Sequence, residues 1–100
     1  MILHAGKAQS LLEEATLNSR SQQFDQAEAL IQQAISENTL AHKSHQTLLQ
    51  HYSSSEDMTV DLLLLHAEDY LMSTKNSITL ASELLAVYQR LVAIEDKIKS

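Results

Sequence analysis

The chain contains no proline and a single glycine, Gly6, among its 100 residues. Proline and glycine supply most of the tight turns of β-sheets and most of the breaks in helices. Aromatic residues, which are typical of strands, make up only 4% of the sequence. A chain with so few turn and strand signals is expected to be all-α.

Two short polar segments divide the sequence into three predicted helices. The segments are SRSQQ at 19–23 and SSSED at 53–57, and the predicted helices cover about 2–18, 24–52 and 57–98. In the second segment, serines followed by two acids are typical of a helix N-terminus. Because both connections are short, consecutive helices are expected to run antiparallel. The prediction is one domain over residues 1–100, an antiparallel three-helix bundle.

The composition excludes several classes of function. The chain has no cysteine, so disulfides, thiolate nucleophiles and thiolate metal sites are excluded. Its net charge of −6, without clusters of lysine and arginine, disfavours nucleic acid and favours a basic protein as partner. The sequence has neither an uninterrupted apolar run of bilayer length nor a secretory signal pattern. A cytoplasmic protein without membrane insertion is expected.

Apolar residues recur three and four positions apart in the second and third predicted helices, as they do where helices pack. The positions in the second helix are Phe24, Ala27, Ile31, Ala34, Asn38, Ala41, His45, Leu48 and Tyr52. Those in the third are Leu64, Ala67, Leu71, Ile78, Ala81, Leu85, Tyr88 and Val92. These two stripes are predicted to form the core of the bundle.

The third helix carries a second stripe, well over a quarter-turn away from the first at about 100° per residue. Its members are Leu62, Leu65, Asp69 and Met72. A helix with two apolar faces in a three-helix chain has one face left to bury, so this face is expected to meet another copy in a symmetric oligomer. Asp69 lies in the middle of the stripe and His66 at its edge, about 60° away.

Asp69 therefore has two interpretations. It can be a polar residue that sets the register of a coiled-coil seam. Alternatively, symmetry brings several Asp69 carboxylates together, where they repel one another unless shared protons or a cation compensate. An all-oxygen site of this kind suits a hard divalent cation such as Mg²⁺.

The exact residue order of the third predicted helix is also informative, because it matches the motif of a known family. The block HAEDYLM at 66–72, preceded by VDLLLL and followed by ELLAVYQRL at 83–91, resembles the lactose/cellobiose/chitobiose class of enzyme IIA in the phosphoenolpyruvate-dependent sugar phosphotransferase system (PTS). The third helix of that class reads close to H-A-Q-D-H-L-M. ILHAGKAQSLLEEA at 2–15 and FDQAEALIQQA at 24–34 are similar to further segments of the family, and LAHKSHQTLLQ at 40–50 is similar less closely.

The resemblance implies a phosphotransferase component that carries a phosphoryl group on a histidine. It would accept the group from the phosphocarrier protein HPr and pass it to a cysteine of the IIB component, for uptake of a lactose-, cellobiose- or chitobiose-type disaccharide. Carried over by position, His66 is the phosphoryl acceptor. Asp69 is the carboxylate on the axis of a homotrimer of nine helices, where family members can hold Mg²⁺; no organic cofactor is implied.

The sequence departs from the family pattern at four positions. The usual glutamine beside the active histidine is Glu68 here, and an anion there would repel a phosphoryl group unless it turns outward. The second histidine of the motif is Tyr70, a glutamine of the second helix is His45, and an arginine of the first helix is Gln9.

Two other functions remain open. One is a helical adaptor that binds amphipathic partner helices in its grooves without phosphoryl transfer. The other is a regulatory homologue that has lost phosphoryl transfer, which Glu68 beside the histidine motif suggests. His42 and His45, one turn apart, can be read as metal ligands, but a pair without a third ligand is more often a packing or surface feature. His4 and His51 have no sequence neighbours that suggest a role.

Overall fold

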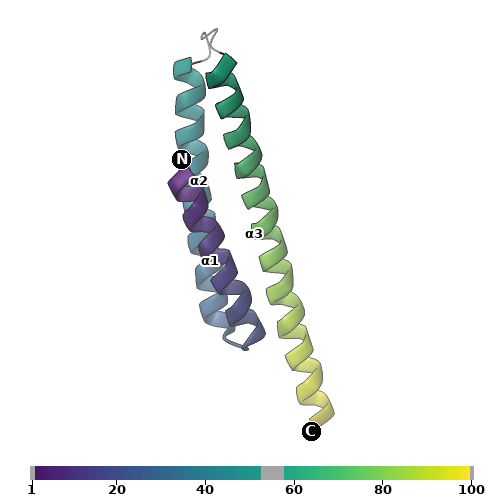
Figure 1. Ribbon diagram of the computed structural model, residues 1–100. Helices are drawn as coiled ribbons and strands as arrows, with labels where there is room; N and C mark the ends of the chain where they lie inside the picture. Colours follow the sequence, from purple (N-terminus) through teal and green to yellow (C-terminus); the bar gives the residue numbers. More distant parts are fainter. Residues whose placement is uncertain (1, 53–57, 100) are drawn as a thin grey trace.

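The computed structural model describes the backbone of residues 2–52 and 58–99, and the side chains of residues 4–51 and 62–99. It contains three helices, α1 (Ile2–Arg20), α2 (Phe24–Tyr52) and α3 (Met58–Lys99). The helices pack against one another in an antiparallel rod of 67 × 16 × 15 Å (Figure 1). The prediction of an all-α bundle is confirmed; the predicted capping segment at 53–57 lies outside the described residues.

The turn between α1 and α2 is tighter than the sequence indicates, because α1 continues two residues past its predicted end to Arg20. The amide of Gln23 donates to the carbonyl of Asn18 at 2.8 Å, and the amide of Gln22 donates to the carbonyl of Ser19 at 3.2 Å. Gln22 has a φ of 67°. These two bonds and the left-handed residue form a Schellman motif, which satisfies the last carbonyls of the helix without glycine.

The core lies where the two predicted stripes meet α1. At the turn end, Leu12, Ile31 and Leu85 are buried with five alanines of the three helices. At the other end, Leu71 is buried with Ala5 and Ala41, and Tyr70 packs against this cluster. The many alanines allow the helix backbones to approach closely, since they add almost no side-chain bulk between them.

A polar bridge inside the core connects α1 to α3. The side-chain amide of Gln9 donates to the hydroxyl of Thr74 at 3.0 Å, and this hydroxyl donates to the backbone carbonyl of Tyr70 at 3.0 Å. Thr74 is completely buried. Of the two bonds, only the one from Gln9 depends on the position of α1 along α3, and its loss would take this partner from the partly buried amide of Gln9.

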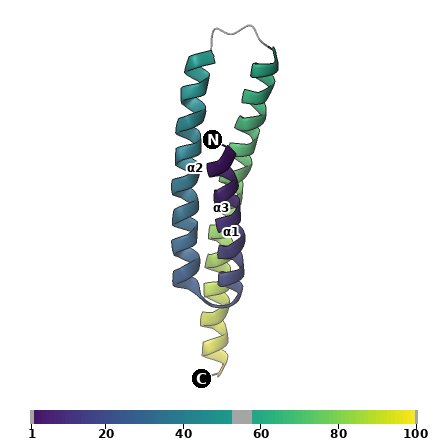
Figure 2. The same ribbon diagram turned by 60° about the vertical axis from the view of Figure 1, so that its left-hand side comes forward.

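α3 extends beyond the other two helices at its C-terminal end (Figure 2). Leu85 is the last buried residue of α3, and Tyr88 and Val92 are half-buried. Every described side chain from Ala93 onward is exposed. By length and composition alone, the segment Leu62–Lys99 could also cross a membrane. The core helix of a soluble bundle has the same properties, and one side of this segment packs on α1 and α2.

Away from the core, three charged or titratable side chains connect α1 to α2. Nδ1 of His4 lies 2.6 Å from Oε2 of Glu37, and Nζ of Lys7 lies 3.3 Å from Oε1 of the same carboxylate. The Glu37 side chain is only 16% exposed. The hydrogen bond from His4, aided by Lys7, lowers the pKa of Glu37 below its usual value near 4.5, although partial burial opposes the shift.

His45 and Asn38 are the buried polar residues of α2, and neither is fully satisfied. His45 is 4% exposed, and within the described parts of the chain neither of its ring nitrogens has a hydrogen-bond partner; the side-chain oxygen of Asn38 has none there either. Buried polar atoms without partners lose their bonds to water and gain nothing in return. His45 is therefore a packing residue that costs stability in the single chain.

We predict that Glu37→Gln lowers the melting temperature at pH 7. A carboxyl group whose pKa falls on folding stabilises the protein above its unfolded pKa, and this contribution disappears as the pH falls through the folded pKa. The difference between the variant and the wild type should therefore shrink below about pH 4.5, as measured by circular dichroism melts across pH. Glu14→Gln, an exposed glutamate of α1, is the control. A difference that does not change with pH would contradict this role of Glu37.

We predict that His45→Leu stabilises the protein by about 1 kcal/mol, because it removes two buried nitrogens without partners and keeps a similar volume. Chemical denaturation followed by circular dichroism measures the change. His42→Leu is the control, since His42 is only half-buried and should gain less. A clear loss of stability in His45→Leu would mean that the ring nitrogens have partners in the assembled protein.

Candidate functional site

The two residues singled out by the sequence lie on the solvent side of α3, near the end where α2 and α3 are joined. His66 and Asp69 are both exposed, and they lie one turn apart on the same side of the helix. Ala67, between them, points into the core. The backbone of α3 therefore carries both side chains outward from a part of the helix that is fixed by packing.

Neither side chain has a polar partner in the single chain. Among the described residues, no hydrogen bond or ion pair holds the ring of His66 or the carboxylate of Asp69. In a neutral imidazole, a hydrogen-bond partner on one nitrogen fixes the tautomer and so sets which nitrogen acts as the nucleophile.

Asp69 lies within a continuous exposed stripe that runs down α3, which we call the outer stripe. Its members are Leu62, Leu65, Asp69, Met72, Asn76, Leu80, Leu84, Val87, Leu91, Ile94 and Ile98, and all are exposed. It repeats on average every 3.6 residues or so, the period of a straight α-helix, and it lies opposite the buried stripe. The expectation that Leu62, Leu65, Asp69 and Met72 form a second, unburied face is confirmed for the single chain.

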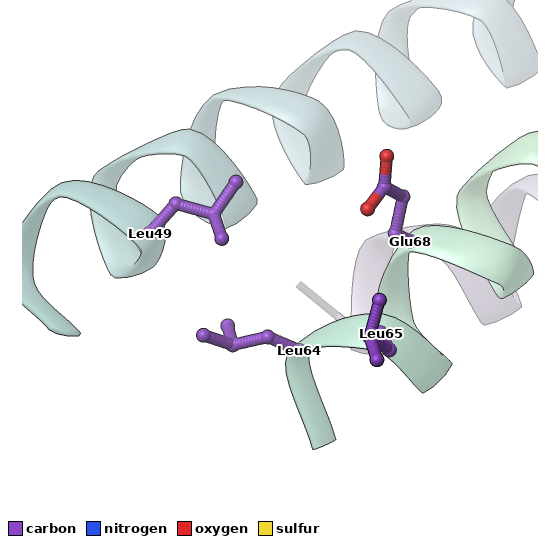
Figure 3. Close-up of a pocket in the computed structure, with 4 residues that line it drawn as sticks. All are labelled: Leu49, Leu64, Leu65 and Glu68. Atoms are coloured by element: carbon purple, nitrogen blue, oxygen red, sulfur yellow. The ribbon is translucent and has the colours of Figure 1, made fainter. Parts of the chain in front are cut away.

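Glu68 does not share the face of His66. Two residues along a helix correspond to about 160° around it, so the two side chains point to nearly opposite sides. Glu68 lines a cavity of about 360 Å³ between α2 and α3, together with Leu49, Leu64 and Leu65. Leu49 and Leu64 point toward one another across this cavity (Figure 3). The Glu68 carboxylate is thus directed away from the histidine of its own chain.

The other departures from the family pattern have structural roles. Tyr70 is half-buried against the core cluster around Leu71, and Gln9 forms the polar bridge to Thr74. His45 is buried and His42 is half-buried on α2. In the described part of the chain, no three histidine, aspartate or glutamate side chains gather as metal ligands. A metal at Asp69 would therefore need carboxylates from further copies.

Sequence reasoning missed the partner of His4. Glu37 lies 33 positions further along the chain, and no local pattern pairs the two residues. The clue available in the sequence is that Glu37 lies on α2 next to the buried Asn38, at the border of the packed face. This ion-pair cluster lies on α1 and α2 and contains none of the outer-stripe residues, so it stabilises the fold and is no part of the candidate site.

The chain matches the family model described as the PTS system lactose/cellobiose-specific IIA subunit over residues 1–89. It is 36% identical to the oligo-beta-mannoside-specific EIIA component of Bacillus subtilis over 89 residues, which is 89% of this chain and 81% of the relative. It is 31% identical to the lactose-specific EIIA component of Staphylococcus epidermidis, over 90% of this chain and 86% of the relative. It is 29% identical to the N,N'-diacetylchitobiose-specific EIIA component of Escherichia coli K12, over 93% and 80%.

No solved structure matches the chain significantly. The family match covers most of the sequence and includes the third-helix block with His66 and Asp69. Membership of this family implies PTS partners such as HPr and a IIB component. The chain therefore belongs to the lactose/cellobiose-specific IIA family of the phosphotransferase system, and it is an EIIA phosphocarrier of lactose/cellobiose/chitobiose-type sugar uptake.

Proposed function

We propose that His66 is the residue that carries the phosphoryl group. One nitrogen of the neutral imidazole attacks phosphorus, an N–P bond forms, and the bond to HPr breaks. The transfer to IIB repeats the step in reverse order: a IIB thiolate attacks and the N–P bond breaks. The observation that supports this role is the exposure of His66 at the edge of the outer stripe of α3, within the family's third-helix block.

Exposure suits a carrier that meets two proteins in turn. A histidine in a closed pocket would have to open for both partners, whereas His66 is accessible while α3 stays packed through Ala67 and Leu71. Proton transfer contributes little to this reaction, so catalysis depends on positioning and on electrostatic stabilisation of the transferred group. The docked partner completes the site. Glu68 points to another side of α3, which leaves the approach to His66 of the same chain free of that charge.

We predict that phosphorylated HPr labels the wild type with one phosphoryl group per chain, and that His66→Ala abolishes the labelling while helicity is unchanged. The modification should be acid-labile and base-stable, as expected for phosphohistidine, and intact-protein mass spectrometry measures it. His42→Ala is the matched control and should keep the label. Labelling of His66→Ala would reject the assignment. Absence of label in the wild type, with capture of amphipathic helices, would favour the adaptor.

We further propose that three copies assemble with their outer stripes around a common axis. This arrangement would cover the apolar members of the stripe, leave His66 at its margin, and bring three Asp69 carboxylates together. Three carboxylates at close range repel, and oxygen ligands from three copies suit Mg²⁺. Asp69 would hold the ion, and the ion would supply charge neutralisation on the axis. The assembly is expected to be cytoplasmic.

We predict that Asp69→Leu retains or strengthens the trimer, because an apolar residue replaces three clustered carboxylates. Addition of Mg²⁺ should raise the melting temperature of the wild type and leave that of Asp69→Leu unchanged. Sedimentation and thermal melts with and without Mg²⁺ measure the two effects. Asp96→Leu, an acid of α3 outside the outer stripe, is the control. Dissociation of Asp69→Leu into monomers would mean that the carboxylate makes an essential contact between copies.

A further inference from the structure

The ion-pair cluster that connects α1 to α2 also has the parts of a nucleophilic site. It consists of His4, Lys7 and Glu37, and none of its members lies on α3. The outer stripe and the contacts proposed for it therefore do not include the cluster. No described residue holds the ring of His66, whereas Glu37 holds the ring of His4. The fold thus keeps the imidazole of His4 in a defined orientation.

The carboxylate of Glu37 determines which nitrogen of His4 is available. Oε2 of Glu37 lies 2.6 Å from Nδ1 of His4, and the pKa of this carboxyl group is lowered, so it is ionised at neutral pH and only accepts hydrogen bonds. Nδ1 therefore carries the proton, and in the neutral ring the lone pair is on Nε2. The His4 side chain is 38% exposed, and no group in the described residues bonds to Nε2. Nε2 is thus the nucleophilic atom of a partly exposed ring.

The charges of the cluster match those that a group transfer to this nitrogen creates. When the lone pair of Nε2 forms a bond to an electrophile, the ring becomes positive, and the Glu37 carboxylate already lies against its Nδ1–H. Nζ of Lys7 lies 3.3 Å from the other oxygen of this carboxylate, and the lysine side chain is exposed. Its positive charge attracts an anionic reagent to this surface. An oriented imidazole beside a lysine therefore suits an anionic electrophile, the class to which phosphoryl donors belong.

We propose that His4 is a second phosphoryl acceptor, which takes its phosphoryl group from a small acyl phosphate. The lone pair of Nε2 attacks phosphorus and an N–P bond forms, while the P–O bond to the acyl group breaks and its electron pair leaves with the carboxylate. The proton on Nδ1 stays in the hydrogen bond to Glu37. A small donor suits this position because His4 is only partly exposed, whereas His66, which would meet whole proteins, is exposed.

The acceptor is tested with acetyl phosphate in His66→Ala, which removes the acceptor proposed for HPr. We expect a label on His4 that forms at least about tenfold faster than the label on the ring introduced by a further change, Glu14→His, at an exposed position of the same helix. Mass spectrometry of peptides prepared without acid measures both rates in one sample. His4→Gln should lose its label and keep its helicity by circular dichroism. Equal rates at the two positions, or no label on His4, would reject the proposal.

The two supporting charges are tested separately, at a temperature where all variants remain helical. Glu37→Gln leaves an amide that cannot neutralise the positive ring, so the labelling of His4 should slow by about tenfold. Lys7→Gln should slow it by about two- to fivefold, and this loss should shrink at high salt. Lys43→Gln, which changes an exposed lysine of α2 outside the cluster, is the control. Unchanged labelling in Glu37→Gln would mean that the carboxylate only connects the two helices.

The orientation of the ring is tested by NMR. Nitrogen–proton correlation spectra should show the neutral His4 ring of the wild type protonated on Nδ1, and the labelled ring should carry phosphorus on Nε2. Phosphorus on Nδ1 would overturn the proposal, since that nitrogen is the one bonded to Glu37. The inference does not rest on His66. Acetyl phosphate measures the label on His4 and phosphorylated HPr measures the label on His66, so either assignment can fail while the other stands.

Discussion

The structure depends on the contrast between the two faces of α3. One face packs its apolar residues against the hairpin of α1 and α2, and the opposite face presents an equally regular stripe to solvent. Packing through Leu71, Thr74 and Leu85 fixes the rotation of the helix about its own axis. Once this rotation is set, the directions of His66 and Asp69 follow from helix geometry alone. The candidate site therefore needs no loop or separate scaffold.

Much of this arrangement could be predicted from the sequence. The three helices and both buried stripes follow from apolar spacing, which reports directly on the side of a helix that meets its neighbours. The exposure of Leu62, Leu65 and Met72 follows from the same spacing. The position of His66 beside that stripe required only the angle per residue. These features are local in the chain, which is why a single sequence reveals them.

The features that could not be predicted are contacts between helices at a particular register. The pairing of His4 with Glu37 and the bridge from Gln9 to Thr74 depend on how far one helix slides along another. Spacing within one helix does not contain that information. The two-residue extension of α1 could not be predicted for the same reason. Ser19 is buried by packing between helices, although its sequence neighbours are those of a polar linker.

The sequence differences from the family motif also become easier to interpret. Glu68 looked unfavourable for a phosphoryl carrier because it follows the histidine so closely in the chain. In the structure it lines the cavity with Leu49 and Leu64, on a different side of the helix. The sequence therefore exaggerates the repulsion between Glu68 and a phosphoryl group on His66, because residues two apart on a helix do not face each other. Tyr70, likewise, contributes mainly to packing.

The unbroken hydrogen bonding of α3 has a consequence for how this chain can diverge. Its 42 residues contain no glycine or proline, the residues that most readily break or kink a helix. One residue inserted between Asp69 and Leu84 would rotate the N-terminal part of α3, with His66 and Asp69, by about 100° relative to the part that follows the insertion. The imidazole would then face a different direction although its own neighbours were unchanged. The number of residues between Asp69 and Leu84 is therefore constrained by this geometry.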